Sequence, residues 1–165
     1  MVSAARCPAA AGVGKGTLFR AFGSRDGFLD ALCVAKLTPL REVVETGEAP
    51  LGPGAPSRER IVAFLDALLT IELENRHLIR AREVSFAGMR QSEHYRWMYG
   101  LLRNLIEDAA PGATAGDAGY AAHVLLAALR IDLIEELLAT GLSLQAIRRS
   151  LAPLTTAVVA DTQRE

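Results

Sequence analysis

The chain is poor in aromatic residues and cysteine, and it lacks long uncharged apolar runs. Only 5% of its 165 residues are aromatic, and its two cysteines, Cys7 and Cys33, lie far apart. This spacing offers neither a disulfide framework nor a CxxC site, and free thiols are typical of cytoplasmic proteins. No apolar run reaches the roughly 18 residues of a transmembrane helix, and the N-terminus lacks the apolar core of a secretory signal. We therefore expect a cytoplasmic protein with no membrane partner.

Motifs of catalysis and metal binding are also missing from the sequence. It contains no nucleophile elbow, no HExxH motif and no glycine fingerprint that follows a strand. Its three histidines, His77, His94 and His123, do not have the spacing of metal ligands. We expect no enzymatic activity, no metal and no cofactor.

Alanine and leucine are abundant, and half of all residues are hydrophobic. This composition predicts an all-α fold. A Gly- and Pro-rich stretch over residues 46–56 reads as a loop and divides the chain. We expect an N-terminal head with a connecting helix over residues 1–45, and a helical domain over residues 46–165.

Apolar residues recur at helical spacing in most of the chain. The expected helices cover residues 24–45, 57–73, 77–87, 92–108, 117–140 and a last segment from 143 onward. Pro39 and Pro153 should kink or interrupt the helices that contain them. The helix over 117–140 is apolar around most of its circumference, so it requires burial on two sides. One side can face its own domain, and a second copy of the chain most simply covers the other.

The most densely patterned stretch is Gly12–Leu29, with the sequence GVGKGTLFRAFGSRDGFL. Gly12 supplies a tight turn, because glycine accepts positive φ without steric cost. A short helix is expected over residues 15–21. Gly23 ends this helix, and Ser24 is suited to cap the next one. The pattern of turn, short helix, turn and longer helix is that of a helix-turn-helix, whose second helix enters the DNA major groove.

The charge distribution agrees with this interpretation. Residues 1–25 contain four basic residues and no acidic one, which leaves 14 Lys and Arg against 19 Asp and Glu in the rest of the chain. A basic head on an acidic body indicates a polyanionic partner at one end. Four charges alone would more simply form a solvated helix face, so the spacing of the turns decides the interpretation.

The stretch AGVGKGTLFRAFGSRDGFLDAL resembles the helix-turn-helix of tetracycline-repressor-like (TetR family) regulators. The positions that match the family's common form are Ala11, Gly12, Val13, Lys15, Gly16, Thr17, Leu18, Phe22, Ser24 and Leu29. The sequence departs from that form at Gly14, Phe19 and Ala21, where the family usually has Ser, Tyr and His. The usual Tyr and His contact phosphate, so these departures imply fewer contacts to the DNA backbone.

The resemblance implies a set of DNA-binding residues. Lys15 and Thr17 would reach base edges, and Gly16 would allow close approach of the backbone. The remaining contacts would come from Phe19, Arg20 and Arg25. Only residues 1–11 precede Gly12, and Pro8 lies among them, so we expect the first helix of the family's DNA-binding head to be missing.

A rival motif overlaps the same residues. The stretch from Gly12 to Thr17 resembles the end of a nucleotide-binding P-loop, which needs a buried strand before it and a helix after it. The preceding residues MVSAARCP contain a single β-branched residue and are unsuited to a buried strand. A P-loop enzyme is therefore a remote alternative.

The body is expected to bind a ligand and to dimerise, as the resemblance implies. A small-molecule site needs a few convergent polar groups among apolar walls. The candidate ligand-binding residues are Arg82, Phe86, His94, Tyr95, Met98, Tyr120, His123 and Arg130. The candidate dimerisation residues are Leu126, Leu129, Leu133, Leu137, Leu151 and Leu154.

The sequence thus predicts a homodimeric transcriptional regulator. It would bind double-stranded DNA at a pseudo-palindromic operator, as a repressor that responds to an unknown small-molecule effector. A protein of a different class stays open as an alternative: a helical dimer that binds a ligand or a partner but does not bind DNA. Gel shifts with the promoter DNA distinguish the two.

Overall fold

The computed structural model describes residues 20–83 and 89–161, which are helical apart from turns and contain no strand. The predicted all-α fold is therefore confirmed. The helices are α3 (Arg25–Thr46), α4 (Ser57–Glu74), α5 (Arg76–Glu83), the short 3₁₀ helix η1 (Met89–Gln91), α6 (Glu93–Ala109), α7 (Ala115–Ala127), α8 (Ile131–Ala139) and α9 (Leu144–Asp161). In this part of the chain, no helix combines the length and the hydrophobicity that crossing a membrane requires.

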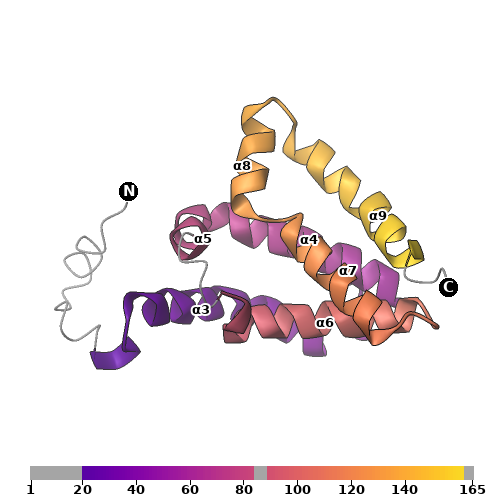
Figure 1. Ribbon diagram of the computed structural model, residues 1–165, viewed down its shortest axis with the longest axis horizontal. Coiled ribbons are helices and arrows are strands. Elements are labelled where there is room, and N and C mark those ends of the chain that lie inside the picture. Colours follow the sequence, from indigo (N-terminus) through magenta and orange to yellow (C-terminus); the bar gives the residue numbers. More distant parts are fainter. Residues whose placement is uncertain (1–19, 84–88, 162–165) are drawn as a thin grey trace.

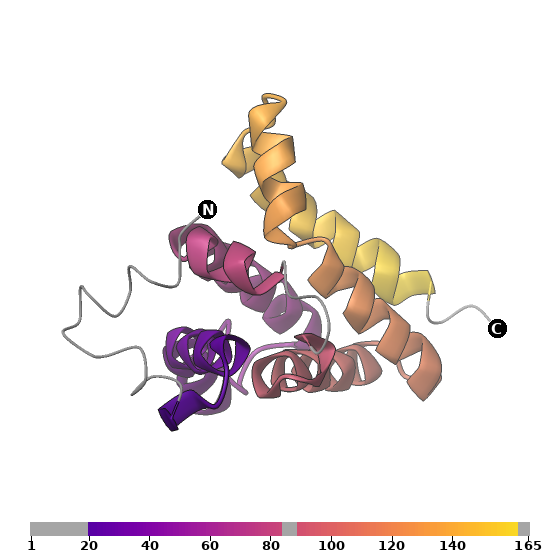
Figure 2. The ribbon, with the colours of Figure 1, turned by 60° about the vertical axis from the view of Figure 1, so that its left-hand side comes forward.

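The helices form a layered body with one projecting corner. Helices α3 and α6 lie side by side, and α4 packs across α6 (Figure 1). Helix α7 doubles back along α6, α8 turns away from the body, and α9 returns to pack against α4 and α7 (Figures 1 and 2). The corner between α8 and α9 therefore projects from the body, and α3 forms one edge of it.

Helix α3 begins where the sequence predicts. Gly23 has a φ of 71°, and the Ser24 hydroxyl accepts a hydrogen bond from the Gly27 backbone N–H at 3.0 Å. Of the two outcomes predicted at Pro39, a kink or an interruption, the interruption does not occur, because α3 continues through Pro39 to Thr46. Proline removes one helical hydrogen bond, but buried residues before and after it hold the helix on the core. These buried residues of α3 are Leu29, Cys33, Leu37, Leu40 and Val44.

The far end of α3 is fixed by Arg60 of α4. The Arg60 guanidinium donates to the carbonyl oxygens of Val44 and Leu51, each at 3.1 Å. Carbonyl groups in the last turn of a helix have no partner within the helix, so a guanidinium donor satisfies them. Arg60 thereby joins the end of α3 to the loop over residues 47–56.

The contact between α6 and α7 depends on small residues of α7. Ala118, Gly119, Ala121 and Ala122 are all buried. A Cβ atom on Gly119 would lie 2.8 Å from the hydroxyl oxygen of Tyr99, so a larger residue there would require the Tyr99 side chain to shift. The large buried side chains of α7, Leu125 and Leu126, follow on the same helix. Helix α7 is therefore held against α6 by shape as well as by apolar area.

The predicted single helix over 117–140 is wrong, because it divides into α7 and α8. The backbone N–H groups of Leu129 and Arg130 donate to carbonyl oxygens three residues earlier, at 3.2 and 3.3 Å, which ends α7 in a tight turn. Asp132 then accepts from the Leu133 N–H at 2.9 Å and from the Arg130 guanidinium at 2.8 Å. An acidic residue in the first turn is a signal for a helix start, and Asp132 provides it.

Helix α9 is attached to α4 by an arginine. Arg148 donates to both carboxylate oxygens of Asp66, at 2.6 and 2.7 Å, and to the Thr70 hydroxyl at 2.8 Å. The α9 helix begins after Ser143, whose hydroxyl accepts from the Ala146 N–H at 3.2 Å, and it continues past Pro153. Asp66 and Arg148 are each more than a third exposed, so their pair sets the orientation of α9 more than it stabilises the fold.

The core makes a direct stability prediction. Leu102 of α6 is fully buried, whereas Leu142 in the α8–α9 corner is 41% exposed. We expect Leu102→Ala to lower the free energy of unfolding by about 2–5 kcal/mol, since it removes apolar contacts and leaves a cavity. The same substitution at Leu142 should change it by less than about 1 kcal/mol. Urea denaturation followed by circular dichroism measures both values, and equal losses at the two positions would contradict the described core.

Candidate ligand cavity

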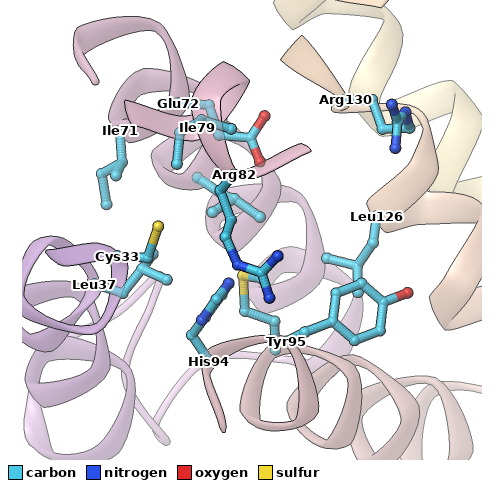
Figure 3. A pocket seen from close by; sticks show the side chains of 12 residues that line it. Cys33, Leu37, Ile71, Glu72, Ile79, Arg82, His94, Tyr95, Leu126 and Arg130 are labelled. Atoms are coloured by element: carbon cyan, nitrogen blue, oxygen red, sulfur yellow. The ribbon is translucent and has the colours of Figure 1, made fainter. Parts of the chain in front are cut away.

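A cavity of about 70 Å³ lies between five helices and the turn before α8. Its walls are mainly apolar, with a small number of polar groups (Figure 3). The lining residues are Cys33 and Leu37 of α3, Leu68, Ile71 and Glu72 of α4, Ile79 and Arg82 of α5, His94, Tyr95 and Met98 of α6, Leu126 of α7, and Arg130. Apolar walls with few polar groups are typical of small-molecule sites.

Arg82 is the most deeply buried charge at the cavity. Its side chain is 4% exposed, and Figure 3 shows it reaching from α5 to a place between His94 and Tyr95. Its Nε donates to Oδ1 of Asp30 at 2.5 Å, and its Nη2 lies 3.3 Å from Oδ2. Asp30 belongs to α3 and is 30% exposed. The ion pair therefore joins the N-terminal half of α3 to α5 at the wall of the cavity.

His94 lies next to this ion pair. Its side chain is 9% exposed, and its Nδ1 is 4.0 Å from Oδ1 of Asp30, which is too far for a hydrogen bond. Its Nε2 lies 3.4 Å from the hydroxyl oxygen of Ser92. Burial lowers the pKa of His94 below its usual value of 6.5, although the Asp30 carboxylate opposes this shift. His94 is therefore neutral at physiological pH.

Cys33 is a buried thiol in the α3 wall of the cavity. It is 1% exposed, and burial raises the pKa of the thiol to about 11, with the Asp30 carboxylate acting in the same direction. The thiolate is the reactive form of cysteine. Cys33 thus stays protonated at neutral pH and contributes to the wall as a small apolar side chain.

An aromatic cluster lies behind the cavity, between α6 and α7. The Tyr95 hydroxyl forms a hydrogen bond with Nδ1 of His123 at 2.7 Å, and the rings of Tyr99 and His123 stack with their centroids 4.5 Å apart. Burial raises the pKa of Tyr95 and lowers that of His123. Because His123 stacks on Tyr99 and forms a hydrogen bond with Tyr95, the cluster fixes Tyr95 in the wall of the cavity.

The structure brings together part of the ligand-binding set that the sequence suggests. Arg82, His94, Tyr95, Met98 and Arg130 all line the cavity. His123 is absent from the lining and contacts Tyr95 instead.

Two members of the predicted set do not belong to the cavity wall. The assignment of Tyr120 is corrected, because its side chain is 73% exposed on α7. On a helix that is apolar all round, the sequence does not reveal which face is buried. Phe86 lies outside the residues that the structure describes.

Sequence analysis missed the contribution of α3 to the cavity. Asp30, Cys33 and Leu37 lie three and four residues apart, so they share one face of the helix. That spacing was available as a signal, since an acid on the apolar face of a helix is unusual. Their partner Arg82 is 52 residues away in the sequence, so the pairing itself needed the fold.

The residues proposed to contact DNA are only partly described. Arg20 and Arg25 are exposed, and Arg25 lies 4.0 Å from Asp26. The rings of Phe22 and Phe28 pack edge to face across the turn at Gly23, with centroids 5.2 Å apart. Lys15, Gly16, Thr17 and Phe19 lie outside the described residues.

Three of the proposed dimerisation residues belong to the core of the protomer. Leu126, Leu129 and Leu151 are 8%, 1% and 4% exposed, so little of their surface is available to a second copy and their assignment is corrected. Leu133 is 40% exposed, and Leu137 and Leu154 are partly buried against the core. Apolar residues at helical spacing predict a buried face, but they do not show whether that face packs on the core of its own protomer or on a second copy.

A wider groove lies between α4 and α9, with a volume of about 730 Å³. It is open to solvent, and the charged residues Asp66 and Arg148 at its wall already pair with each other. The smaller cavity is more enclosed and contains the buried Arg82 and His94, so it is the better candidate for a ligand site. Within residues 20–83 and 89–161, no three His, Cys, Asp or Glu side chains lie close enough to hold a metal ion.

Comparisons of the chain with models of known protein families, with curated proteins and with solved structures find no match.

The burial of His94 predicts how stability depends on pH. Because the folded state holds the pKa of His94 below 6.5, the unfolded chain binds a proton first as the pH falls. The stability due to neutral His94 is therefore complete above pH 6.5 and is lost as the pH falls through the folded pKa. We expect the free energy of unfolding in urea to fall less steeply between about pH 7 and about pH 5 in His94→Leu than in the unmodified chain.

The same substitution at His77, which is exposed on α5, controls for the loss of a histidine. Some pH dependence should persist in His94→Leu, because the pKa of His123 is also lowered. An unchanged slope in His94→Leu would contradict the burial of a neutral His94.

Proposed function

We propose that this chain is a DNA-binding transcriptional regulator of the TetR type, a repressor that acts as a homodimer and responds to a small-molecule effector. One observation carries the proposal. Helix α3 begins within the stretch that resembles a helix-turn-helix, and further along the same helix Asp30, Cys33 and Leu37 lie in the region of the internal cavity. A single helix thus connects the DNA-binding segment to the ligand site.

This connection supports a physical mechanism of regulation. A ligand in the cavity touches α3 directly and lies beside the Asp30–Arg82 ion pair. If the ligand binds one position of α3 better than another, it shifts the population toward that position. In a dimer, such a shift changes the separation of the two DNA-binding segments, which has to match half-sites about 34 Å apart.

The homodimer is supported by exposed apolar residues on α7 and by a segment of α9 that contains no charge. On α7, Tyr120 and Ala127 are exposed, and on α9 the residues 150–157 include no charged side chain. Helices α7 and α9 pack against each other in the protomer. Contiguous surfaces depleted in charge are typical of interfaces, and a second copy of the same pair of helices would form a four-helix interface.

A ligand- or partner-binding protein without DNA binding is the second candidate. The observation that favours it is that the described cavity is built from residues 33–130, all of which lie after the DNA-binding segment. Ligand binding therefore does not require DNA binding. Binding of the chain to promoter DNA separates the two candidates.

DNA binding makes the first prediction of the proposal. Lys15→Ala and Thr17→Ala should each weaken binding to the DNA upstream of the chain's own coding sequence by about 1–3 kcal/mol, with little effect on scrambled DNA. Arg25→Ala should weaken binding to both DNAs and lower the salt dependence by about one ion per subunit. Fluorescence anisotropy at several salt concentrations measures these effects.

Arg58→Ala is the matched control for Arg25→Ala. It removes an exposed arginine from the first turn of α4, which follows the opposite end of α3, and it should leave the affinity unchanged. Unaltered affinity in both Lys15→Ala and Thr17→Ala would show that the wrong helix has been assigned to the groove.

Dimerisation makes the second prediction. The unmodified chain should sediment as a dimer at micromolar concentration. Tyr120→Asp should produce a folded monomer, because this side chain is exposed in the protomer and a charge there becomes buried only in the dimer. Val43→Asp, at an apolar side chain of α3 that is 42% exposed, should leave the dimer intact. A folded monomer of the unmodified chain would refute the proposed interface.

A further inference from the structure

The charged groups at the cavity already have partners within the chain. Arg82 pairs with Asp30, and the Arg130 guanidinium pairs with Asp132 at 2.8 and 3.1 Å. Glu72 is also engaged in an interaction within the chain. A charged ligand would have to displace one of these partners or remain uncompensated at a buried site, and both are unfavourable. The cavity therefore favours a neutral ligand.

His94 supplies a polar contact that is still unmade. Its Nδ1 is buried and has no hydrogen-bond partner among the residues that the structure describes. The side chain is more than nine-tenths buried, and it lines the cavity (Figure 3). A buried polar atom without a partner is destabilising, so a ligand that satisfies it gains affinity.

The size of the cavity limits the ligand. About 10–15 Å³ of such space holds one water molecule, so about 70 Å³ corresponds to a molecule of roughly five or six non-hydrogen atoms. Leu37, Leu68 and Met98 are among the aliphatic side chains that would contact it. Most of the ligand is therefore apolar.

We propose that the cavity binds a small neutral alcohol, with its hydroxyl group on Nδ1 of His94 and its alkyl part against the aliphatic wall. The inference rests on the proposed function only in naming this alcohol as the effector. A hydroxyl suits His94 in either neutral tautomer. When the Ser92 hydroxyl donates to Nε2, Nδ1 carries the proton and donates a hydrogen bond to the alcohol oxygen. In the other tautomer, the alcohol O–H donates to Nδ1.

The hydroxyl would lie next to α3. Nδ1 of His94 is 4.0 Å from the carboxylate oxygen of Asp30 that accepts from Arg82. An oxygen atom on Nδ1 therefore approaches the ion pair that holds α3. An alcohol in this position contacts the helix that leads to the DNA-binding segment.

The probes are butan-2-ol, butyrate and butylammonium, which share a four-carbon skeleton. Binding to the full chain is followed by NMR of ¹³C-methyl methionine, because Met98 lines the cavity, and by the side-chain ¹⁵N signals of histidine. We expect butan-2-ol to bind in the millimolar range, to shift the Met98 methyl signal and to shift Nδ1 of His94. Butyrate and butylammonium should bind at least about 10-fold more weakly.

The matched variants are His94→Leu and His77→Leu. His94→Leu should lower the affinity for butan-2-ol by about 3- to 10-fold, as expected for the loss of one hydrogen bond. The variant should still bind butan-2-ol more tightly than the charged probes, but by a smaller factor. His77→Leu should leave the affinity unchanged. If His94→Leu does not fold, the ¹⁵N shift of Nδ1 in the unmodified chain decides the matter instead.

Three results would overturn the inference: tighter binding of either charged probe than of butan-2-ol, no binding of butan-2-ol at millimolar concentration, or binding without a shift of Nδ1. These measurements contain no DNA. Promoter binding without alcohol binding would leave the proposed function intact, and alcohol binding without promoter binding would leave the ligand site intact.

Discussion

The ion pair between Asp30 and Arg82 is the interaction on which the arrangement of this molecule depends. Arg82 is 4% exposed, and a buried guanidinium is tolerated only when carboxylates and hydrogen-bond acceptors surround it. Asp30 meets this requirement from α3. The position of α3 is therefore coupled to the interior of the body by a contact that is strongly directional, whereas the apolar contacts around it are not.

The other features follow from this contact. Because Asp30 holds α3 near α5, Cys33 and Leu37 reach the cavity, and burial keeps His94 neutral beside the pair. The small residues of α7 allow it to pack on α6, and Leu126 of the same helix lines the cavity. The cavity contents therefore contact α3 as well as the other helices of the wall, and the start of α3 belongs to the segment that resembles a helix-turn-helix.

Local signals in the sequence predicted the local structure. Ser24 caps α3 as expected, and the expected loop lies between α3 and α4, where glycine and proline gather. The break at residues 128–130 was missed, because a uniformly apolar stretch conceals the tight turn and Asp132 is a weak signal. Tyr120 is exposed instead of lining the cavity, and Leu126 is buried in the protomer, since periodicity does not show which face of an apolar helix is buried or against which neighbour. The Asp30–Arg82 pair joins distant parts of the chain, and only the fold could show it.

A double-mutant cycle between Asp30 and Arg82 tests this account most directly. The free energy of unfolding in urea is measured for the unmodified chain, Asp30→Asn, Arg82→Gln and the double variant, and the same cycle is run on the more exposed pair of Arg103 and Glu107. The account predicts a coupling energy of about 1–3 kcal/mol for Asp30 with Arg82 and less than about 0.5 kcal/mol for the exposed pair. A coupling energy near zero for Asp30 with Arg82 would show that their contact does not hold α3 in place, and would contradict the account.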